Sequence, residues 1–314
     1  MNRFRFLVYS IVIAVGGYGL WAGMNDGQKI LHAVSKVGVS GLLLLCSLSL
    51  LNYVLRYIRW YCMLRRLGDK PSWFDGLLCY WAGFALTTTP GKAGEAIRCL
   101  YFRNRHGVDN THSLAALLTE RVADLLAAML LATGMLMRFE HFRWIAWVLL
   151  SVAALILLLV FMPSFALSIN AWLHARAPHS LQPFFAGVPR FMERSASLLS
   201  PPVLTASVAL GVLSWSAEAF GFAWLAIQLG STESVVVLGG MFALSMIAGA
   251  LLPGGLGGTE AAMAMQLAAV GMGPAEAFVV ALICRLSTLW LAILIGLFAM
   301  LWLDAKPFPA EANR

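Results

Sequence analysis

Long apolar stretches alternate with short polar loops along this chain, and their lengths give the first prediction. Six stretches reach the ~20 apolar residues needed to cross the hydrocarbon core of a bilayer. They lie near residues 6–24, 37–63, 113–137, 143–161, 203–229 and 276–303. Two further apolar stretches, 73–105 and 233–273, are each interrupted by a proline-glycine motif. The pattern predicts an all-α membrane protein with six full transmembrane helices and two broken segments.

The two interruptions resemble each other in sequence. One reads PGKAGE at residues 90–95 and the other PGGLGGTE at residues 253–260. Each ends in a glutamate, Glu95 or Glu260, and each is followed at almost the same separation by an arginine, Arg121 or Arg285. Paired interruptions in the two halves of a membrane protein are a sequence indication of a binding site in a transporter built from repeats.

Counting the separations between matching residues predicts an internal repeat. The Leu-Gly pairs at 67–68 and 229–230 differ by 162, the two motif prolines by 163, the two arginines by 164 and the two glutamates by 165. We expect a single membrane domain over 1–314, with a first span and outer loop (1–35), repeat 1 (36–161), a cytoplasmic linker (162–202) and repeat 2 (203–304). In the linker, the alternation of Phe191, Met192 and Leu198 with charged residues predicts a helix on the membrane surface.

The charge distribution sets the orientation. Only 12% of residues are charged, 60% are hydrophobic and the net charge is +7. Basic residues gather in the loops on one predicted side, which the positive-inside rule makes cytoplasmic. This holds only if 73–105 and 233–273 are re-entrant hairpins, so we expect inverted repeats, both termini in the cytoplasm and a multi-pass location in a bacterial inner membrane. The basic charge then reflects orientation and contact with anionic headgroups, and nucleic-acid binding is not expected.

Metal and cofactor chemistry find no support in the sequence. The five cysteines fall in or beside apolar segments without a CxxC pair, and the six histidines lie in predicted loops without ligand spacing. We therefore expect no metal, no cofactor and no catalytic residues.

The ionisable residues at membrane depth are the candidate site. A charge at the centre of a spanning helix costs about 2.5–3.5 kcal/mol, so such residues face a polar interior and are functional candidates. We expect substrate binding by Lys92, Glu95, Arg98, Arg121, Glu260 and Arg285, with Gly91, Gly94, Gly254, Gly257 and Gly258 shaping helix starts that favour anions. A structural alternative is that Glu95–Arg121 and Glu260–Arg285 are ion pairs that lock the hairpins. Coupling or structural ion pairing is expected for Glu120, Asp124, Glu218 and Arg56.

These motifs together resemble the membrane region of the lysylphosphatidylglycerol synthetase family, also described as flippase-like integral membrane proteins. The resemblance covers nearly the whole chain and rests on five segments: Arg56 and Arg59-Trp60, residues 90–98, residues 120–124, residues 253–260, and Arg285. In two-domain members a soluble domain makes the aminoacyl lipid and the membrane region moves it between leaflets. The resemblance implies transport without the synthase activity, because this sequence stops at Arg314. Other relatives are linked to polyprenyl-phosphate sugars and hopanoids.

The leading hypothesis is therefore a flippase or scramblase for an anionic, phosphate-bearing lipid of the aminoacyl-phospholipid or polyprenyl-phosphate type. The alternative is a membrane-embedded lipid-modifying transferase, which the lack of a Ser-His or metal constellation disfavours. A third interpretation is a membrane anchor or partner subunit, and a homo-oligomer remains open.

Overall fold

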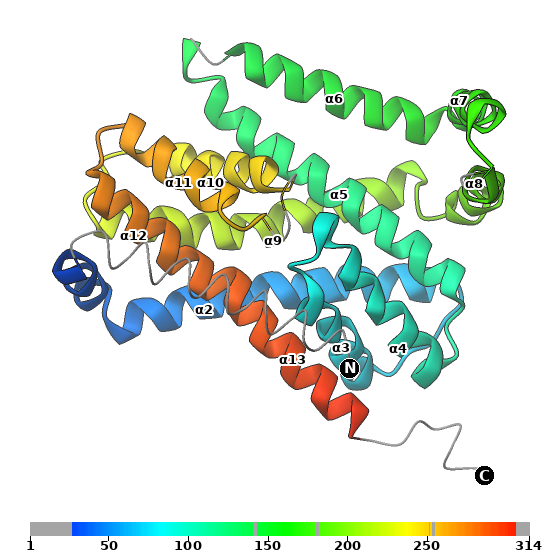
Figure 1. Ribbon diagram of the computed structural model, residues 1–314, viewed down its shortest axis with the longest axis horizontal. Coiled ribbons are helices and arrows are strands. Elements are labelled where there is room, and N and C mark those ends of the chain that lie inside the picture. Colours follow the sequence, from blue (N-terminus) through cyan, green and yellow to red (C-terminus); the bar gives the residue numbers. More distant parts are fainter. Residues whose placement is uncertain (1–26, 141–142, 180–181, 251, 253–254, 306–314) are drawn as a thin grey trace.

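The computed structural model describes residues 27–140, 143–179, 182–250, 252 and 255–305, and in these residues the regular structure is entirely helical (Figure 1). The predicted first span near 6–24 lies outside the described residues. Four of the described helical segments are long and apolar enough to cross a membrane. The chain is therefore an all-α, multi-pass membrane protein.

The four apolar segments match four of the predicted spans closely. They are α2 (Gly27–Arg66), α6 (Arg143–Phe161), α9 (Pro201–Gln228) and the continuous run Pro274–Asp304, which consists of α12 (Pro274–Arg285), the π-helical turn η5 (Leu286–Trp290) and α13 (Leu291–Asp304). Helix α2 begins earlier than the predicted span and bends at Gly38, whose φ of 64° is a value that glycine adopts readily.

The predicted span near 113–137 is helix α5 (Asn110–Leu136). Its 27 residues would extend about 40 Å at 1.5 Å per residue. The Asp109 side chain caps its start by accepting a hydrogen bond from the Thr111 backbone N–H. Glu120, Arg121 and Asp124 lie near its middle, and three charges within five residues keep α5 out of the set of four apolar segments.

Each interrupted segment forms two short helices separated by a break. The first is α3 (Trp73–Ala82), the 3-10 turns η1 (Gly83–Leu86) and η2 (Pro90–Ala96), and α4 (Ile97–His106). The second is α10 (Val235–Gly249) and α11 (Gly258–Ala269). We name these two units hairpin 1 and hairpin 2. The second half of hairpin 2 starts at Gly258, as predicted. In hairpin 1, α4 starts at Ile97 rather than near Gly94, because the 3-10 turn η2 includes Gly94 and continues to Ala96.

Close backbone approach explains a glycine in the first break. A Cβ on Gly94 would lie 2.6 Å from both the Cβ and the carbonyl oxygen of Leu86, so any larger residue would push the two sides of the break apart. The Gly94 N–H also donates to the Thr89 hydroxyl at 2.6 Å. The break therefore needs glycine for space rather than for an unusual backbone angle.

Helices α2 and α9 lie side by side and run in opposite directions through the middle of the molecule (Figure 1). The Asn52 side-chain amide on α2 donates to the Ser214 carbonyl on α9 at 2.8 Å. Helix α5 packs along α10, and α13 packs along α3 and η1. Each hairpin is thus held by a long helix from the other part of the chain.

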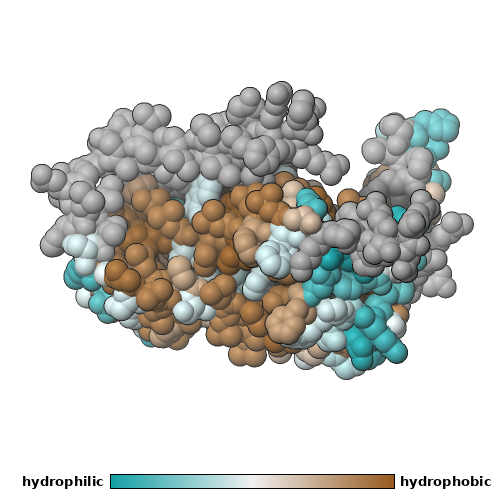
Figure 2. Space-filling model, turned by 90° about the horizontal axis from the view of Figure 1, so that it is seen from below, coloured by the Kyte–Doolittle hydropathy of each residue, from teal (hydrophilic) through white to brown (hydrophobic). Residues whose placement is uncertain are grey.

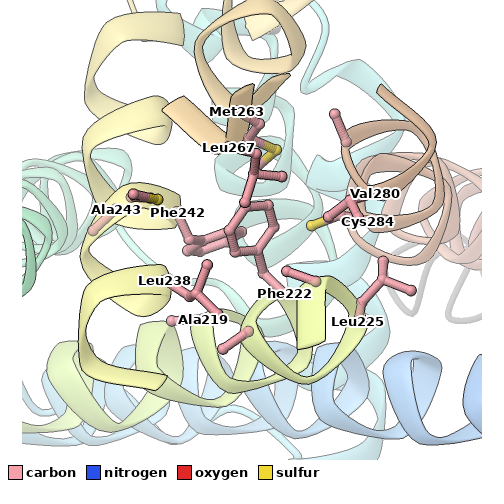
Figure 3. Close-up of a cluster of buried hydrophobic side chains, with 14 of the residues drawn as sticks. Ala219, Phe222, Leu225, Leu238, Phe242, Ala243, Met263, Leu267, Val280 and Cys284 are labelled. Carbon is pink, nitrogen blue, oxygen red and sulfur yellow. The ribbon is translucent and has the colours of Figure 1, made fainter. Parts of the chain in front are cut away.

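Two hydrophobic clusters fill the interior. The larger joins α5, α9, α10, α11 and α12, and Figure 3 shows its centre, where Phe222, Phe242, Met263 and Leu267 converge. The smaller joins α2, α3, α4 and α13 around Tyr57, Trp60, Tyr80 and Phe102. Each cluster surrounds one hairpin, so each hairpin has its own apolar support.

Large apolar side chains also cover the outside. On α6, Trp144 is 64% exposed and Trp147 is 60% exposed. Figure 2 shows hydrophobic residues over the middle of one face and hydrophilic residues toward its ends. Such a continuous apolar surface is typical of protein that contacts lipid.

The linker 162–202 contains two helices, α7 (Pro163–Arg176) and α8 (Gln182–Ser195), which pack on each other. The predicted surface helix corresponds to α8 only in part. Leu198, which we expected on that helix, follows its end and is fully buried in the smaller hydrophobic cluster. The sequence pattern does not distinguish an apolar residue on a helix face from one just beyond the end of the helix.

Candidate functional site

Three carboxylates and four arginines form a continuous buried network in the first half of the chain. Arg56 Nη2 on α2 contacts Glu120 Oε1 at 2.6 Å and Asp124 Oδ2 at 3.1 Å on α5. Arg59, one turn along α2, contacts Asp124 Oδ1 at 2.6 Å. The i,i+4 spacing of Glu120 and Asp124 presents both carboxylates to one face of α2.

Arg98 connects this network to the first break. Its guanidinium contacts Glu95 Oε2 at 2.7 Å and Glu120 Oε2 at 3.3 Å. The same group lies over the rings of Trp60, at 4.7 Å, and Tyr80, at 4.5 Å. Charge pairing and cation–π contact together hold Arg98 in one orientation. Arg98, which the sequence predicted to bind substrate, is completely buried in this structure and contacts Glu95.

Arg121 is the accessible member of the network. Its Nη2 contacts Glu95 Oε2 at 2.6 Å and Glu120 Oε1 at 3.2 Å, yet 30% of its side chain is exposed. The Thr87 hydroxyl donates to Glu95 Oε1 at 2.8 Å and fixes the other side of that carboxylate. The ion pair Glu95–Arg121 is therefore present and reaches an open surface.

The second half contains the matching pair. Arg285 Nε at the end of α12 contacts Glu260 Oε1 at 2.8 Å, and both side chains are buried. Glu260 lies in the first turn of α11, where the helix dipole favours a negative charge. Both ion pairs that the spacing suggested are thus formed.

A cavity of about 240 Å³ lies between the break of hairpin 2, α5 and the start of the π-helical turn. Its charged and polar lining comes from Arg121 and Asp124 on α5, Arg285 on α12, Thr259 on α11 and Trp215 on α9. Its apolar lining is Leu125, Ala128, Met246, Ile247, Ala250, Leu252 and Leu289. This headgroup-sized cavity brings together one arginine from each half of the chain.

A smaller polar cavity of about 50 Å³ adjoins it and shares Trp215, Met246, Arg285 and Leu289 as lining. Its other polar lining is Asn52, Tyr53, Arg56, Thr87, Glu95, Glu218 and Thr288. The volume exceeds the roughly 10–15 Å³ that one water molecule requires. Glu218 and Arg56, which the sequence grouped separately, thus lie at the same cavity as Glu95 and Arg285.

Trp215 is a site residue that the sequence analysis missed. It lines both cavities, and its buried indole N–H has no hydrogen-bond partner among the described residues. A signal for it existed, because Trp215 follows Tyr53 at the same separation as Ser214 follows Asn52. Looking for polar aromatic residues at the repeat separation would have found this pair.

The π-helical turn after Arg285 was also missed. Within it, Thr288 accepts a hydrogen bond on its backbone carbonyl from the Tyr53 hydroxyl. Single π-turns occur often at functional sites because they redirect backbone groups. Nothing in the apolar pattern of 276–303 predicts this turn.

The remaining predicted site residues are glycines and Lys92 at the two breaks. Gly257 adopts a φ of 78° and precedes α11, while Gly258 packs against Leu252. The backbone of Gly91 and Lys92 belongs to η2, but the Lys92 side chain and all of Gly254 lie outside the described parts of the chain.

One comparison with known proteins identifies a family for this chain. Residues 7–296 match the family described as the lysylphosphatidylglycerol synthase TM region. No curated protein shows significant similarity to the chain. The match covers nearly the whole chain and includes both breaks, the charged network and Arg285. The chain belongs to the lysylphosphatidylglycerol synthase transmembrane-region family.

Proposed function

We propose that the chain moves an anionic, phosphate-bearing lipid between the leaflets of a bacterial inner membrane. The observation that carries the proposal is the cavity in which Arg121 and Arg285 line one space next to apolar walls. Guanidinium groups bind phosphate oxygens with paired, charge-assisted hydrogen bonds. The unpartnered Trp215 N–H adds a third donor at the same cavity.

The size of the cavity supports a headgroup site. Pockets that enclose a whole small molecule measure about 300–1,000 Å³. A cavity of about 240 Å³ is large enough for a headgroup but not for a complete lipid. The apolar walls from α5 and α10 then contact the first part of the tail, and the rest of the tail stays in the bilayer.

An inverted repeat would supply the movement. Helix boundaries recur at the predicted separation: helices end at Arg66 and Gln228, and helices start at Trp73 and Val235 and at Asn110 and Pro274. Glycines with positive φ that follow helix ends also recur, as Gly68 and Gly230 and as Gly107 and Gly271. The antiparallel course of α2 and α9 supports opposite orientations for the two halves (Figure 1). Repeats of this kind permit alternating access to a site near the midplane.

In the proposed topology, six helices span the membrane, the hairpins are re-entrant and both termini are cytoplasmic. A cysteine at residue 104, in a variant without the five native cysteines, tests the orientation. We expect an impermeant thiol reagent to label it from the cytoplasmic side only. Labelling from the periplasmic side would contradict the re-entrant hairpin 1.

Reconstitution tests the activity. Purified chain in liposomes with labelled anionic phospholipid should move the label between leaflets without changing its mass. Arg121→Gln and Arg285→Gln each remove a charged donor worth about 1.5–3 kcal/mol, which corresponds to roughly a ten- to hundredfold lower rate. Arg138→Gln is the matched control, because Arg138 is exposed and lies outside the cavity.

The outcomes separate the hypotheses. Normal transport by both cavity variants would contradict the site. A lipid product of altered mass would favour the transferase alternative. Equal rates with zwitterionic and anionic lipids would contradict the selectivity for an anionic headgroup.

A further inference from the structure

Three potential metal ligands converge at the end of hairpin 1 that is remote from its break. Asp75 and Cys79 are one helical turn apart on α3, so they lie on one face of that helix. His106 is the last residue of α4. Their ligand atoms all lie within 4.8 Å of one another. The sequence did not indicate this cluster because the third residue comes from a different helix.

The distances are close to those of a metal site. His106 Nε2 lies 3.1 Å from Asp75 Oδ2, and Cys79 Sγ lies 4.0 Å from the same oxygen. With Zn–N and Zn–O bonds near 2.0–2.2 Å and a Zn–S bond near 2.3 Å, tetrahedral geometry separates ligand atoms by roughly 3.4–3.6 Å. Side-chain shifts within an ordinary rotamer would therefore complete the geometry.

The imidazole of His106 is placed where it could act as a metal ligand. Its side chain is 10% exposed, and its Nε2 makes no hydrogen bond within the described residues despite the short distance to Asp75. The nitrogen thus faces the Asp75 carboxylate at 3.1 Å and lies within 4.8 Å of the Cys79 thiol, an arrangement that suits a metal ligand.

We propose that Asp75, Cys79 and His106 bind one divalent cation of the zinc type, with water as the fourth ligand. A thiolate and an imidazole favour zinc over magnesium or calcium. On binding, the Cys79 thiol loses its proton to solvent and the sulfur forms a bond to the metal. In the proposed topology this end of hairpin 1 faces the reducing cytoplasm, where the thiol stays available.

Arg105 is compatible with such a site. Its Nε and Nη2 contact Asp75 Oδ2 at 2.9 Å and Oδ1 at 3.1 Å, and its Nη1 donates to the Leu303 carbonyl at 3.3 Å. When the metal takes Oδ2, Arg105 keeps Oδ1 and orients the carboxylate from behind, as outer partners of metal ligands do. The metal would then join α3 to α4, next to the end of α13.

Metal titration of the full chain in detergent tests the proposal. With zinc ions as the probe, we expect one high-affinity ion per chain, and Cys79→Ser and His106→Gln should each weaken binding at least tenfold. With cobalt ions, the wild type should show thiolate-to-metal charge-transfer absorption that Cys79→Ser abolishes. Cys62→Ser and His112→Gln are matched controls, since neither residue belongs to the cluster, and both should bind like the wild type.

The result that overturns the proposal is equally specific. Zinc binding by Cys79→Ser equal to that of the wild type would do so, as would the absence of charge-transfer absorption in the wild type. In either case the cluster is a salt bridge between Arg105 and Asp75 with a neighbouring histidine. Because these measurements need no transport, they stand or fail independently of the proposed lipid movement.

Discussion

The break in hairpin 2 lines the larger cavity and the break in hairpin 1 lines the smaller one, and different interactions hold the two breaks. Glu95, at the first break, contacts Arg98 and Arg121, which share Glu120 with Arg56. Near the second break, Glu260 on α11 contacts Arg285 on α12. The first break is thus tied to α2 and α5 through a charged network, whereas this contact ties the second break to α12, the helix that follows it in the chain.

The composition of the network explains this rigidity. Four guanidinium groups face three carboxylates, and all except Arg121 are largely buried. Each buried carboxylate contacts at least two arginines, so no side chain can leave without exposing a partner charge. A buried network of this kind resists rearrangement.

Glu120→Gln should produce the largest effect on stability. The carboxylate is completely buried and contacts Arg56, Arg98 and Arg121, so neutralising it leaves positive charge uncompensated. Removing one member of a buried charged cluster costs about 3–5 kcal/mol. We expect a clearly lower thermal midpoint in detergent than for Glu260→Gln, because Glu120 connects α5 to α2 and α4, whereas the Glu260–Arg285 contact connects α11 to the next helix. Equal losses for the two variants would contradict the difference between the hairpins.

Alanine substitutions of the glycines at the two breaks should destabilise the protein for different reasons. In Gly94→Ala the new Cβ meets Leu86 at 2.6 Å, and overpacking of this kind costs about 1–3 kcal/mol. In Gly257→Ala the Cβ meets no atom within 4 Å, but the φ of 78° costs about 1–2 kcal/mol.

A second substitution distinguishes these causes. Leu86→Ala should partly rescue Gly94→Ala by making room, whereas it should not rescue Gly257→Ala, whose cost comes from the backbone angles (φ 78°, ψ −49°) and not from a contact. Gly239→Ala, with only an ordinary 3.6 Å contact, is the control. A Gly94→Ala protein as stable as the control would refute the steric account.

The fold was predictable where apolar length or glycine chemistry decides it. The span at 143–161 matches α6 residue for residue, and the start of α11 at Gly258 follows from the glycines before it. The partners of Glu120 were not predictable, because Arg56 and Arg98 reach it across 64 and 22 residues through packing. Trp215 was hidden among many apolar residues of α9.

The metal cluster shows the same limit at short range. Asp75 and Cys79 are visible as an i,i+4 pair, but His106 joins them only because hairpin 1 folds back on itself. Spacing rules detect ligands on one element and miss ligands that the turn brings together. The repeat separation would have recovered more of the cavity lining if applied to aromatic and amide residues as well as to charges.

A substitution where α2 and α9 cross should have the smallest effect on stability. It also tests how the two halves of the chain join. Asn52 is 1% exposed and donates to the carbonyl of Ser214, its counterpart at the repeat separation. Replacing it with leucine, which has the same branching and the same number of side-chain heavy atoms, removes a hydrogen bond worth about 0.5–1.5 kcal/mol. We expect Asn52→Leu to lower the unfolding free energy by that amount in chemical denaturation.

The matched control is Ser47→Ala, an exposed position on α2 whose hydroxyl bonds only within its own helix. Because α2 and α9 would rotate against each other in a rocking movement, Asn52→Leu should alter the transport rate more than its small stability loss implies. A rate unchanged from the Ser47→Ala control would show that the crossing is a passive contact. Movement would then involve the hairpins rather than a rotation of α2 against α9.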